Sequence, residues 1–266
     1  MWKWEADNAK GVFVLVHGSG EHHGRYKWLI EQWRENGFHV VMGDLPGHGE
    51  GAKTRGHIDS FDEYIETIAD WIKEAEDYDL PIFLFGHSLG GLAVIRTLTE
   101  KKLPVHAVIL SSPCTGLVKP PPKPVKIFAK VVNSIAPKWR VQIKKSGANP
   151  SATRNKERLK KDSEDPLILR KVSIRWYNQL EIALKAAFDQ IDDFPDIPLL
   201  VMQAGEDKIV DKHDVGHWFN KVPVRDKTYK EWEGLFHEVF NEPEQKEVFG
   251  YALGFVELHL MVHQER

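Results

Sequence analysis

Short runs of four to six apolar residues recur along the chain. Several of them end at a glycine or at a Gly-Asp pair, a pattern typical of strands that are buried on both faces of a parallel sheet. We predict such strands at residues 12–16, 38–42, 82–85, 105–110 and 199–202, and a further alternating strand at 228–232.

Stretches with helical periodicity lie between these runs. Residues 26–36 end at Gly37, a favourable residue just beyond the end of a helix. Residues 61–78 place Tyr64, Ile68, Trp71 and other apolar side chains on one helical face. Because strands and helices alternate, we predict an α/β fold with a mostly parallel central sheet flanked by helices.

The alternation stops between about residue 113 and residue 195. Pro113 and the prolines at 120–122 interrupt regular structure, and mixed helical patterns follow at 125–135 and 167–188. The strand pattern resumes at Ile197. We therefore predict a core formed by residues 1–112 and 196–266, with an inserted helical cap, or lid, formed by residues 113–195.

The composition is that of an ordinary globular protein. The chain has 266 residues, 42% of them hydrophobic, which is enough for one large core. It contains no apolar run long enough to span a bilayer, and its first ten residues lack the pattern of a signal peptide. The single cysteine, Cys114, fits a reducing compartment. We expect a cytoplasmic location.

Charge is distributed unevenly, although the net charge is only -3. Residues 119–145 contain eight lysines and arginines and no acidic residue. Such a segment is either a surface-binding feature or a solvated insertion, and the pattern leaves both open. We expect no nucleic-acid binding, because the isoelectric point is near 6.5 and no known binding motif is present.

Residues 125–135, within this basic segment, have the pattern of an amphipathic helix. Val125, Phe128 and Val131 share one face with other apolar side chains, and lysines flank that face. A helix of this kind can lie in a membrane interface, which would give the protein peripheral contact with a membrane. Alternatively, its apolar face packs on the core. We favour packing on the core, and both would hold if the lid opens.

The most specific motif is Gly-His-Ser-Leu-Gly-Gly at residues 86–91, which fits G-x-S-x-G. It follows a predicted strand and precedes a predicted helix, the setting of a nucleophile at a sharp turn. The glycines leave room for the turn, and the start of the helix directs N–H groups toward developing negative charge. The motif predicts Ser88 as a nucleophile.

A serine hydroxyl needs a base to remove its proton, and in this arrangement an acid and then a histidine follow the serine along the chain. Asp207 follows the predicted strand 199–202 and is the candidate acid. Glu206 and Asp211 are alternatives, although N-capping of a following helix explains Asp211 better. His237 lies in a predicted loop after the last strand, and we predict it as the base.

An oxyanion hole requires two backbone N–H groups. One candidate is Leu89, which directly follows the nucleophile, and the other is Ser19, in the loop after the first strand. Alternatively, His17 and Gly18 in that loop form only a tight turn.

Five segments together resemble the monoglyceride lipase and lysophospholipase branch (serine aminopeptidase S33-type) of the α/β-hydrolase superfamily. The segments are residues 15–26 (H-G-x-G-E-H-x-x-R-Y), 43–49 (D-x-x-G-H-G), 86–91 (G-H-S-L-G-G), 205–211 (G-x-x-D-x-[IL]-V-D) and 236–242 (H-E-[IVL]-x-N-E). The resemblance implies the α/β-hydrolase fold and the triad Ser88, Asp207 and His237, with Ser19 and Leu89 at the oxyanion hole. Glu50 replaces the serine usual in this branch, and residues 113–195 match none of its motifs.

We therefore expect a carboxylic ester hydrolase that cleaves the acyl ester of monoacylglycerols or lysophospholipids through an acyl-enzyme intermediate. The alternatives are a short-chain carboxylesterase of non-lipid esters and a non-catalytic ligand-binding protein of the same fold. A small-molecule lipid ester is the expected partner. We expect no cofactor and no metal, since no metal-ligand spacing occurs. The sequence leaves the oligomeric state open.

Overall fold

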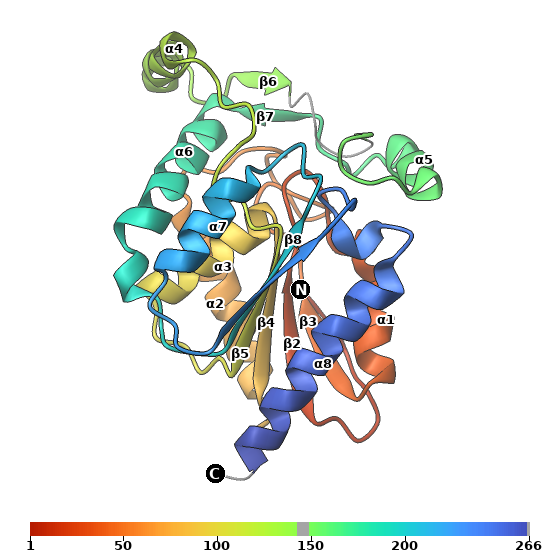
Figure 1. The fold of residues 1–266 in the computed structure, drawn as a ribbon. Helices are drawn as coiled ribbons and strands as arrows, with labels where there is room; N and C mark the ends of the chain where they lie inside the picture. The colour runs from red at the N-terminus through yellow and green to blue at the C-terminus, as the bar shows by residue number, and fades with distance from the viewer. Residues whose placement is uncertain (143–148, 265–266) are drawn as a thin grey trace.

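A seven-stranded sheet forms the centre of the molecule (Figure 1). The computed structural model describes residues 1–142 and 149–264, with side chains as far as Met261. The strand order is β1-β3-β2-β4-β5-β8-β9, with β1 antiparallel to β3 and all other neighbours parallel. The strands are β1 (Trp2–Trp4), β2 (Gly11–Val16), β3 (Phe38–Met42), β4 (Ile82–His87), β5 (Ala107–Ser111), β8 (Leu199–Ala204) and β9 (Lys227–Trp232).

This sheet confirms the predicted α/β fold and all six predicted strands. β5 begins at Ala107, two residues later than we predicted, because Val105 bonds to the nearby carbonyl of Leu103 and not to a neighbouring strand. We did not predict β1, whose three residues are largely exposed at the edge of the sheet. The buried strands carry the continuous apolar pattern, and the exposed edge strand does not.

Helices cover both faces of the sheet (Figure 1). The helices α1 (Lys27–Glu35) and α8 (Gln245–Gln264) lie on one face, where Trp33 stacks on Phe13 with ring centroids 3.8 Å apart. The other face is covered by α2 (Asp62–Glu76), α3 (Leu89–Glu100) and α7 (Lys212–Lys221). Two apolar cores therefore hold the sheet from opposite sides.

The segment between β5 and β8 contains α4 (Lys123–Ile135), β6 (Arg140–Gln142), α5 (Lys156–Glu164), β7 (Lys171–Ser173) and α6 (Ile174–Asp189). We predicted one helical pattern over residues 167–188, and this was wrong at its start. β7 pairs antiparallel with β6 before α6 begins, and Ser173 caps α6 by accepting a hydrogen bond from the N–H of Trp176. Trp176 and Leu180 on α6 pack into the core beside α3.

The apolar face of α4 does not pack on the core, and our preference for packing was wrong. Ile127, Phe128 and Ile135 are 64%, 68% and 81% exposed, and Ala129 is the buried residue of this helix. The helix lies beyond the end of α6, not over the sheet (Figure 1), so only one side of it is covered. Lys144 and Lys145 of the predicted basic segment lie outside the described residues.

Membrane-spanning segments were sought among the described helices. None of those helices combines the length and the apolar composition needed to cross a bilayer.

Two glycines give opposite expectations for stability. A Cβ at Gly90 would lie 2.4 Å from the carbonyl oxygens of Val16 and His17, because α3 approaches the end of β2 closely. We expect Gly90→Ala to lower the free energy of unfolding by about 1–3 kcal/mol. Gly216 in α7 has open space around its Cα, so Gly216→Ala should raise it by about 0.5–1 kcal/mol.

Urea unfolding of both variants measures these free energies. Equal effects of the two substitutions would contradict the close approach of α3 to β2.

Candidate active site

Ser88 occupies the sharp turn between β4 and α3. Its backbone angles are φ 52° and ψ -117°, a region that a residue with a side chain rarely adopts. The turn is held by hydrogen bonds from the N–H of Ser88 to the carbonyl of Ser111 and from the N–H of Leu92 to the carbonyl of Ser88. Strain held in this way is typical of functional positions.

The structure brings the three predicted residues together at the carboxyl ends of the strands. His237 Nε2 lies 2.8 Å from Ser88 Oγ, and His237 Nδ1 lies 2.8 Å from Asp207 Oδ2. The imidazole therefore bridges a hydroxyl and a carboxylate. This is the arrangement that a base needs in order to take a proton from the serine.

Asp207 is also fixed by its own loop. Its Oδ1 accepts hydrogen bonds from the N–H groups of Ile209 and Val210, and its Oδ2 accepts one from Gln203 Nε2. The two alternative acids lie elsewhere: Glu206 is exposed, and Asp211 caps α7 as we expected.

The electrostatics of the pair favour a charged carboxylate beside a basic imidazole. Burial opposes ionisation of Asp207, but His237 and the two N–H groups outweigh it and lower the pKa of Asp207. Burial likewise opposes protonation of His237, but the Asp207 carboxylate outweighs it and raises the pKa of His237 above 6.5. Glu238 and Glu21 add to this effect.

The two predicted oxyanion donors, Ser19 and Leu89, line one cavity together with Ser88. The loop that carries Ser19 is tightly held: the N–H of Gly18 donates to Glu21 Oε1 over 2.6 Å, and His17 Nε2 accepts from the N–H of Leu45. Burial keeps His17 neutral by lowering its pKa. The assignment of the two donors stays a prediction, and their placement is compatible with it.

A buried ionic network lies behind this loop, and sequence reasoning missed it. Arg25 forms ion pairs with Glu21, with Glu238 at 2.9 Å and with Asp162 at 2.6 Å. Burial opposes the charge on Glu21, but Arg25, together with His87, His17 and a hydrogen bond from Tyr26, outweighs it and lowers the pKa of Glu21. Residues 21, 25 and 238 lie within motifs that we quoted, but no spacing rule connects them.

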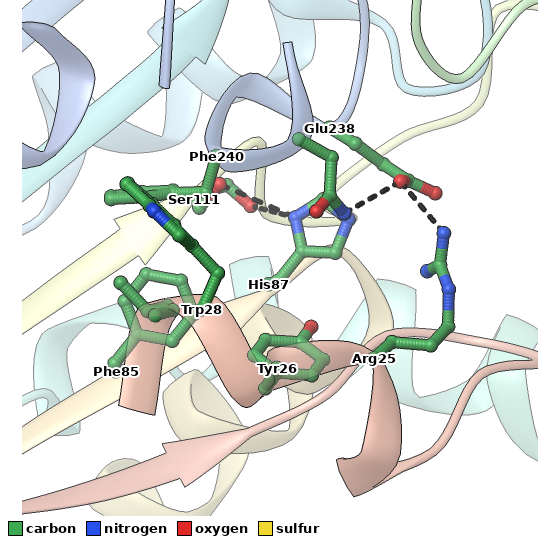
Figure 2. Close-up of a pocket in the computed structure, with 10 residues that line it drawn as sticks. Arg25, Tyr26, Trp28, Phe85, His87, Ser111, Glu238 and Phe240 are labelled. Carbon is green, nitrogen blue, oxygen red and sulfur yellow. Dashed lines mark hydrogen bonds and ion pairs between the residues drawn. The ribbon is translucent and has the colours of Figure 1, made fainter. Parts of the chain in front are cut away.

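His87, the residue before Ser88, lies beside Glu238 and Arg25 of this network (Figure 2). Its Nδ1 lies 3.1 Å from the carbonyl oxygen of Ser111, and its ring centroid lies 4.9 Å from that of His237. Burial and the nearby His237 lower the pKa of His87. His87 therefore stays neutral beside the imidazole that contacts Ser88.

The cavity above Ser88 has a volume of about 560 Å³, a size suited to a small-molecule ligand. Much of its wall is apolar, and the segment between β5 and β8 supplies a large share of it: Val125, Ala129, Val141, Val172, Ile174, Trp176, Tyr177 and Leu180. The arrangement can hold an apolar chain next to an activated serine.

One group of side chains in the described part of the chain has the chemistry of metal ligands. Atoms of His22, His23 and Asp44 lie within 4.8 Å of one another. His22 Nε2 bonds to Asp165 at 2.8 Å, and His23 Nδ1 bonds to Asp44 at 2.9 Å. These hydrogen bonds account for the cluster without a metal ion.

Comparisons with known proteins agree with this geometry. Residues 7–244 match the family described as Serine aminopeptidase, S33. The chain is 48% identical to Phospholipase YtpA of Bacillus subtilis, over 98% of this chain and 100% of that protein. It is 28% identical to Monoacylglycerol lipase of Mycolicibacterium smegmatis, over 97% of this chain and 92% of that protein.

A solved structure is also similar. The crystal structure of Paleococcus ferrophilus monoacylglycerol lipase superposes with a TM-score of 0.85 at 32% identity and covers 98% of each chain. The chain is therefore an α/β-hydrolase that belongs to the serine aminopeptidase S33 family, in the branch of carboxylic ester hydrolases that contains the monoglyceride lipases.

Proposed function

We propose that the protein hydrolyses the acyl ester of monoacylglycerols or lysophospholipids through an acyl-enzyme on Ser88. The observation that carries this proposal is the hydrogen-bonded series Asp207–His237–Ser88 at the base of a largely apolar cavity. The names of its relatives, a phospholipase and a monoacylglycerol lipase, support lipid esters as the substrate class.

In the first half of the reaction, Ser88 Oγ attacks the ester carbonyl while His237 Nε2 takes its proton. The N–H groups of Leu89 and Ser19 bind the oxyanion of the tetrahedral intermediate. His237 then gives its proton to the leaving alcohol as the ester C–O bond breaks, and the acyl group stays on Ser88.

Water completes the second half. His237 takes a proton from a water molecule as the water oxygen attacks the acyl carbonyl. The same oxyanion hole binds the second tetrahedral intermediate. His237 returns the proton to Ser88 Oγ as the acyl bond breaks, which releases the fatty acid. Asp207 stays ionised throughout and stabilises the imidazolium of His237.

We assign residues 113–195 the role of a cap that closes the acyl site. Val125, Ala129 and Val141 from its outer part face the cavity. A short-chain carboxylesterase remains the second candidate, since it would use the same triad. The size and apolar lining of the cavity favour a longer acyl chain.

The exposed face of α4 supports peripheral contact with a membrane. Its apolar side chains are uncovered beside the cavity, and Lys123 and Lys130 flank them. These side chains would be buried in the lipid interface, and the lysines would be attracted to anionic headgroups. The cavity would then lie at the membrane surface, where lipid substrates are found.

Replacement of the nucleophile tests the proposed chemistry. We expect Ser88→Ala to lower kcat for a p-nitrophenyl acyl ester by at least about 10⁴-fold, because the acyl-enzyme cannot form. Labelling with a fluorophosphonate should be lost as well. Circular dichroism provides the control for folding.

The same assay separates the candidate functions. Activity that survives in Ser88→Ala within a few fold would contradict the acyl-enzyme proposal. If kcat/KM of the wild type falls as the acyl chain is lengthened from acetyl to lauroyl, the short-chain carboxylesterase is correct and lipid esters are not the substrate.

The pKa of His237 predicts the pH dependence. Only neutral His237 can accept the proton of Ser88, so kcat/KM should fall as the pH drops through a pKa that lies above 6.5. Asp207→Asn removes the carboxylate that raises this pKa. It should move the acid limb of the profile to lower pH and reduce kcat by about 10⁴-fold.

A pH profile of kcat/KM for both proteins measures the shift. An acid limb that does not move in Asp207→Asn would show that Asp207 does not set the pKa of His237.

Vesicle binding tests the membrane contact. We expect Phe128→Ser combined with Ile135→Ser to weaken cosedimentation with phosphatidylglycerol vesicles by at least about tenfold, because a large apolar side chain contributes on the order of 1.5 kcal/mol when buried. Added salt should weaken binding of the wild type.

Leu258→Ser serves as the matched control, since Leu258 is 53% exposed on α8. Vesicle binding that is equal in all three proteins would exclude α4 as the contact.

A further inference from the structure

Gln203 is a buried polar side chain in β8, a strand that is otherwise apolar. Leu199 and Val201 of this strand face the core that α3 and α7 cover, and the alternation of a strand places Gln203 on the same face. Gln203 is fully buried and does not line the cavity above Ser88. A buried amide is costly unless it is hydrogen-bonded, so its partners indicate what it does.

The amide nitrogen of Gln203 has two partners. Nε2 donates to Asp207 Oδ2 and to the carbonyl oxygen of Ala204, each over 3.1 Å. Both partners can only accept, so turning the amide round would set its oxygen against two other oxygens. Its Oε1 has no hydrogen-bond partner among the described residues. The polar contacts of this side chain are thus made through its nitrogen, and one of them is to the carboxylate that contacts His237.

Two N–H donors share Oδ2 of Asp207. Gln203 Nε2 donates to it, and His237 Nδ1 lies 2.8 Å from it, whereas Oδ1 is held by two backbone N–H groups. A donor bound to the carboxylate draws negative charge toward itself, so less charge remains to stabilise the imidazolium. Gln203 binds most strongly when His237 is neutral, because the carboxylate charge is then uncompensated. It therefore favours the imidazole form that can accept the proton of Ser88.

We propose that Gln203 is a positioning residue for the hydrolysis, an inference that rests on the proposed function of Ser88, Asp207 and His237. Its amide holds Oδ2 of Asp207 beside His237 and limits how strongly the carboxylate stabilises the imidazolium. Asp207 makes His237 basic, and Gln203 keeps this basicity from rising so far that the imidazole is protonated at neutral pH.

Other titratable groups surround this pair, and replacement of Gln203 alters none of them. Those that line the cavity with His237 or feel the charge of Asp207 are Glu21, Arg25, His87, Cys114, Lys208, Tyr229 and Glu238. Burial raises the pKa of Cys114 and that of Tyr229 to about 12, so both stay neutral where His237 titrates. A change in the pH profile on replacing Gln203 can therefore be assigned to Asp207 and its hydrogen bonds.

Gln203→Met removes the amide and keeps the length of the side chain. The readout is the pH profile of kcat/KM for p-nitrophenyl butyrate. We expect the acid limb to move to higher pH by about 0.5, opposite to the shift in Asp207→Asn, because the carboxylate then stabilises the imidazolium more strongly. Above this limb, kcat should fall about threefold to tenfold, since Asp207 loses a hydrogen bond. KM should not change, because Gln203 does not line the cavity.

Thr97→Val is the matched control, because Thr97 is also buried and hydrogen-bonded but lies at the end of α3 away from Ser88. It should leave the pH profile unchanged. Gln203→Asn keeps an amide but is one carbon shorter, so it should move the acid limb in the same direction as Gln203→Met. It serves as the test if circular dichroism shows that Gln203→Met does not fold.

Asp207→Asn combined with Gln203→Met separates this role from a merely structural one. Because Gln203 acts through the charge of Asp207, its replacement should have little further effect in the Asp207→Asn background. A loss that is equal in both backgrounds would overturn the proposal. An acid limb that stays in place or moves to lower pH in Gln203→Met would overturn it too.

The wild type distinguishes the failure of this proposal from the failure of the proposed function. If the wild type hydrolyses the ester and Gln203→Met leaves the acid limb in place, this proposal alone is contradicted. If the folded wild type neither hydrolyses the ester nor reacts with a fluorophosphonate, the proposed function is contradicted, and this proposal fails with it.

Discussion

The guanidinium of Arg25 binds three carboxylates that come from distant parts of the chain. Glu21 belongs to the loop that carries Ser19, Glu238 directly follows His237, and Asp162 lies on α5, between β5 and β8. Asp162 and Glu238 are 137 and 213 residues away from Arg25. One buried cation therefore joins the loop that carries Ser19, the loop that carries His237 and the segment between β5 and β8.

Such a network constrains the structure because separating its buried ion pairs would cost a large free energy. A buried carboxylate without a partner is strongly destabilising, so each of the three segments must keep its place against Arg25. Arg158 adds a second cation to Asp162 at 3.0 Å, and Tyr26 donates a hydrogen bond to Glu21. The β4–α3 turn fixes Ser88 from the sheet side, and Arg25 fixes the loops that face it.

The sequence was sufficient for the sheet and for the three side chains, Ser88, Asp207 and His237, that the structure brings into hydrogen-bond contact. Buried parallel strands require continuous apolar runs, and the turn at Ser88 requires glycines, so both features are visible locally. The network around Arg25 was not predictable, because its partners meet only through the tertiary fold. The periodicity of α4 predicted an apolar face correctly, but periodicity does not say what covers that face, and the structure leaves it open to solvent.

Asp207 gives the neighbouring imidazoles of His87 and His237 different basicities. His87 and His237 lie side by side, and burial alone would lower the pKa of each. Glu21 and Glu238 favour the charged form of both imidazoles, but of the two only His237 bonds to Asp207, so the pKa of His237 rises while that of His87 falls. The network around Arg25 therefore fixes the loops, while Asp207 makes the imidazole that contacts Ser88 the more basic of the two.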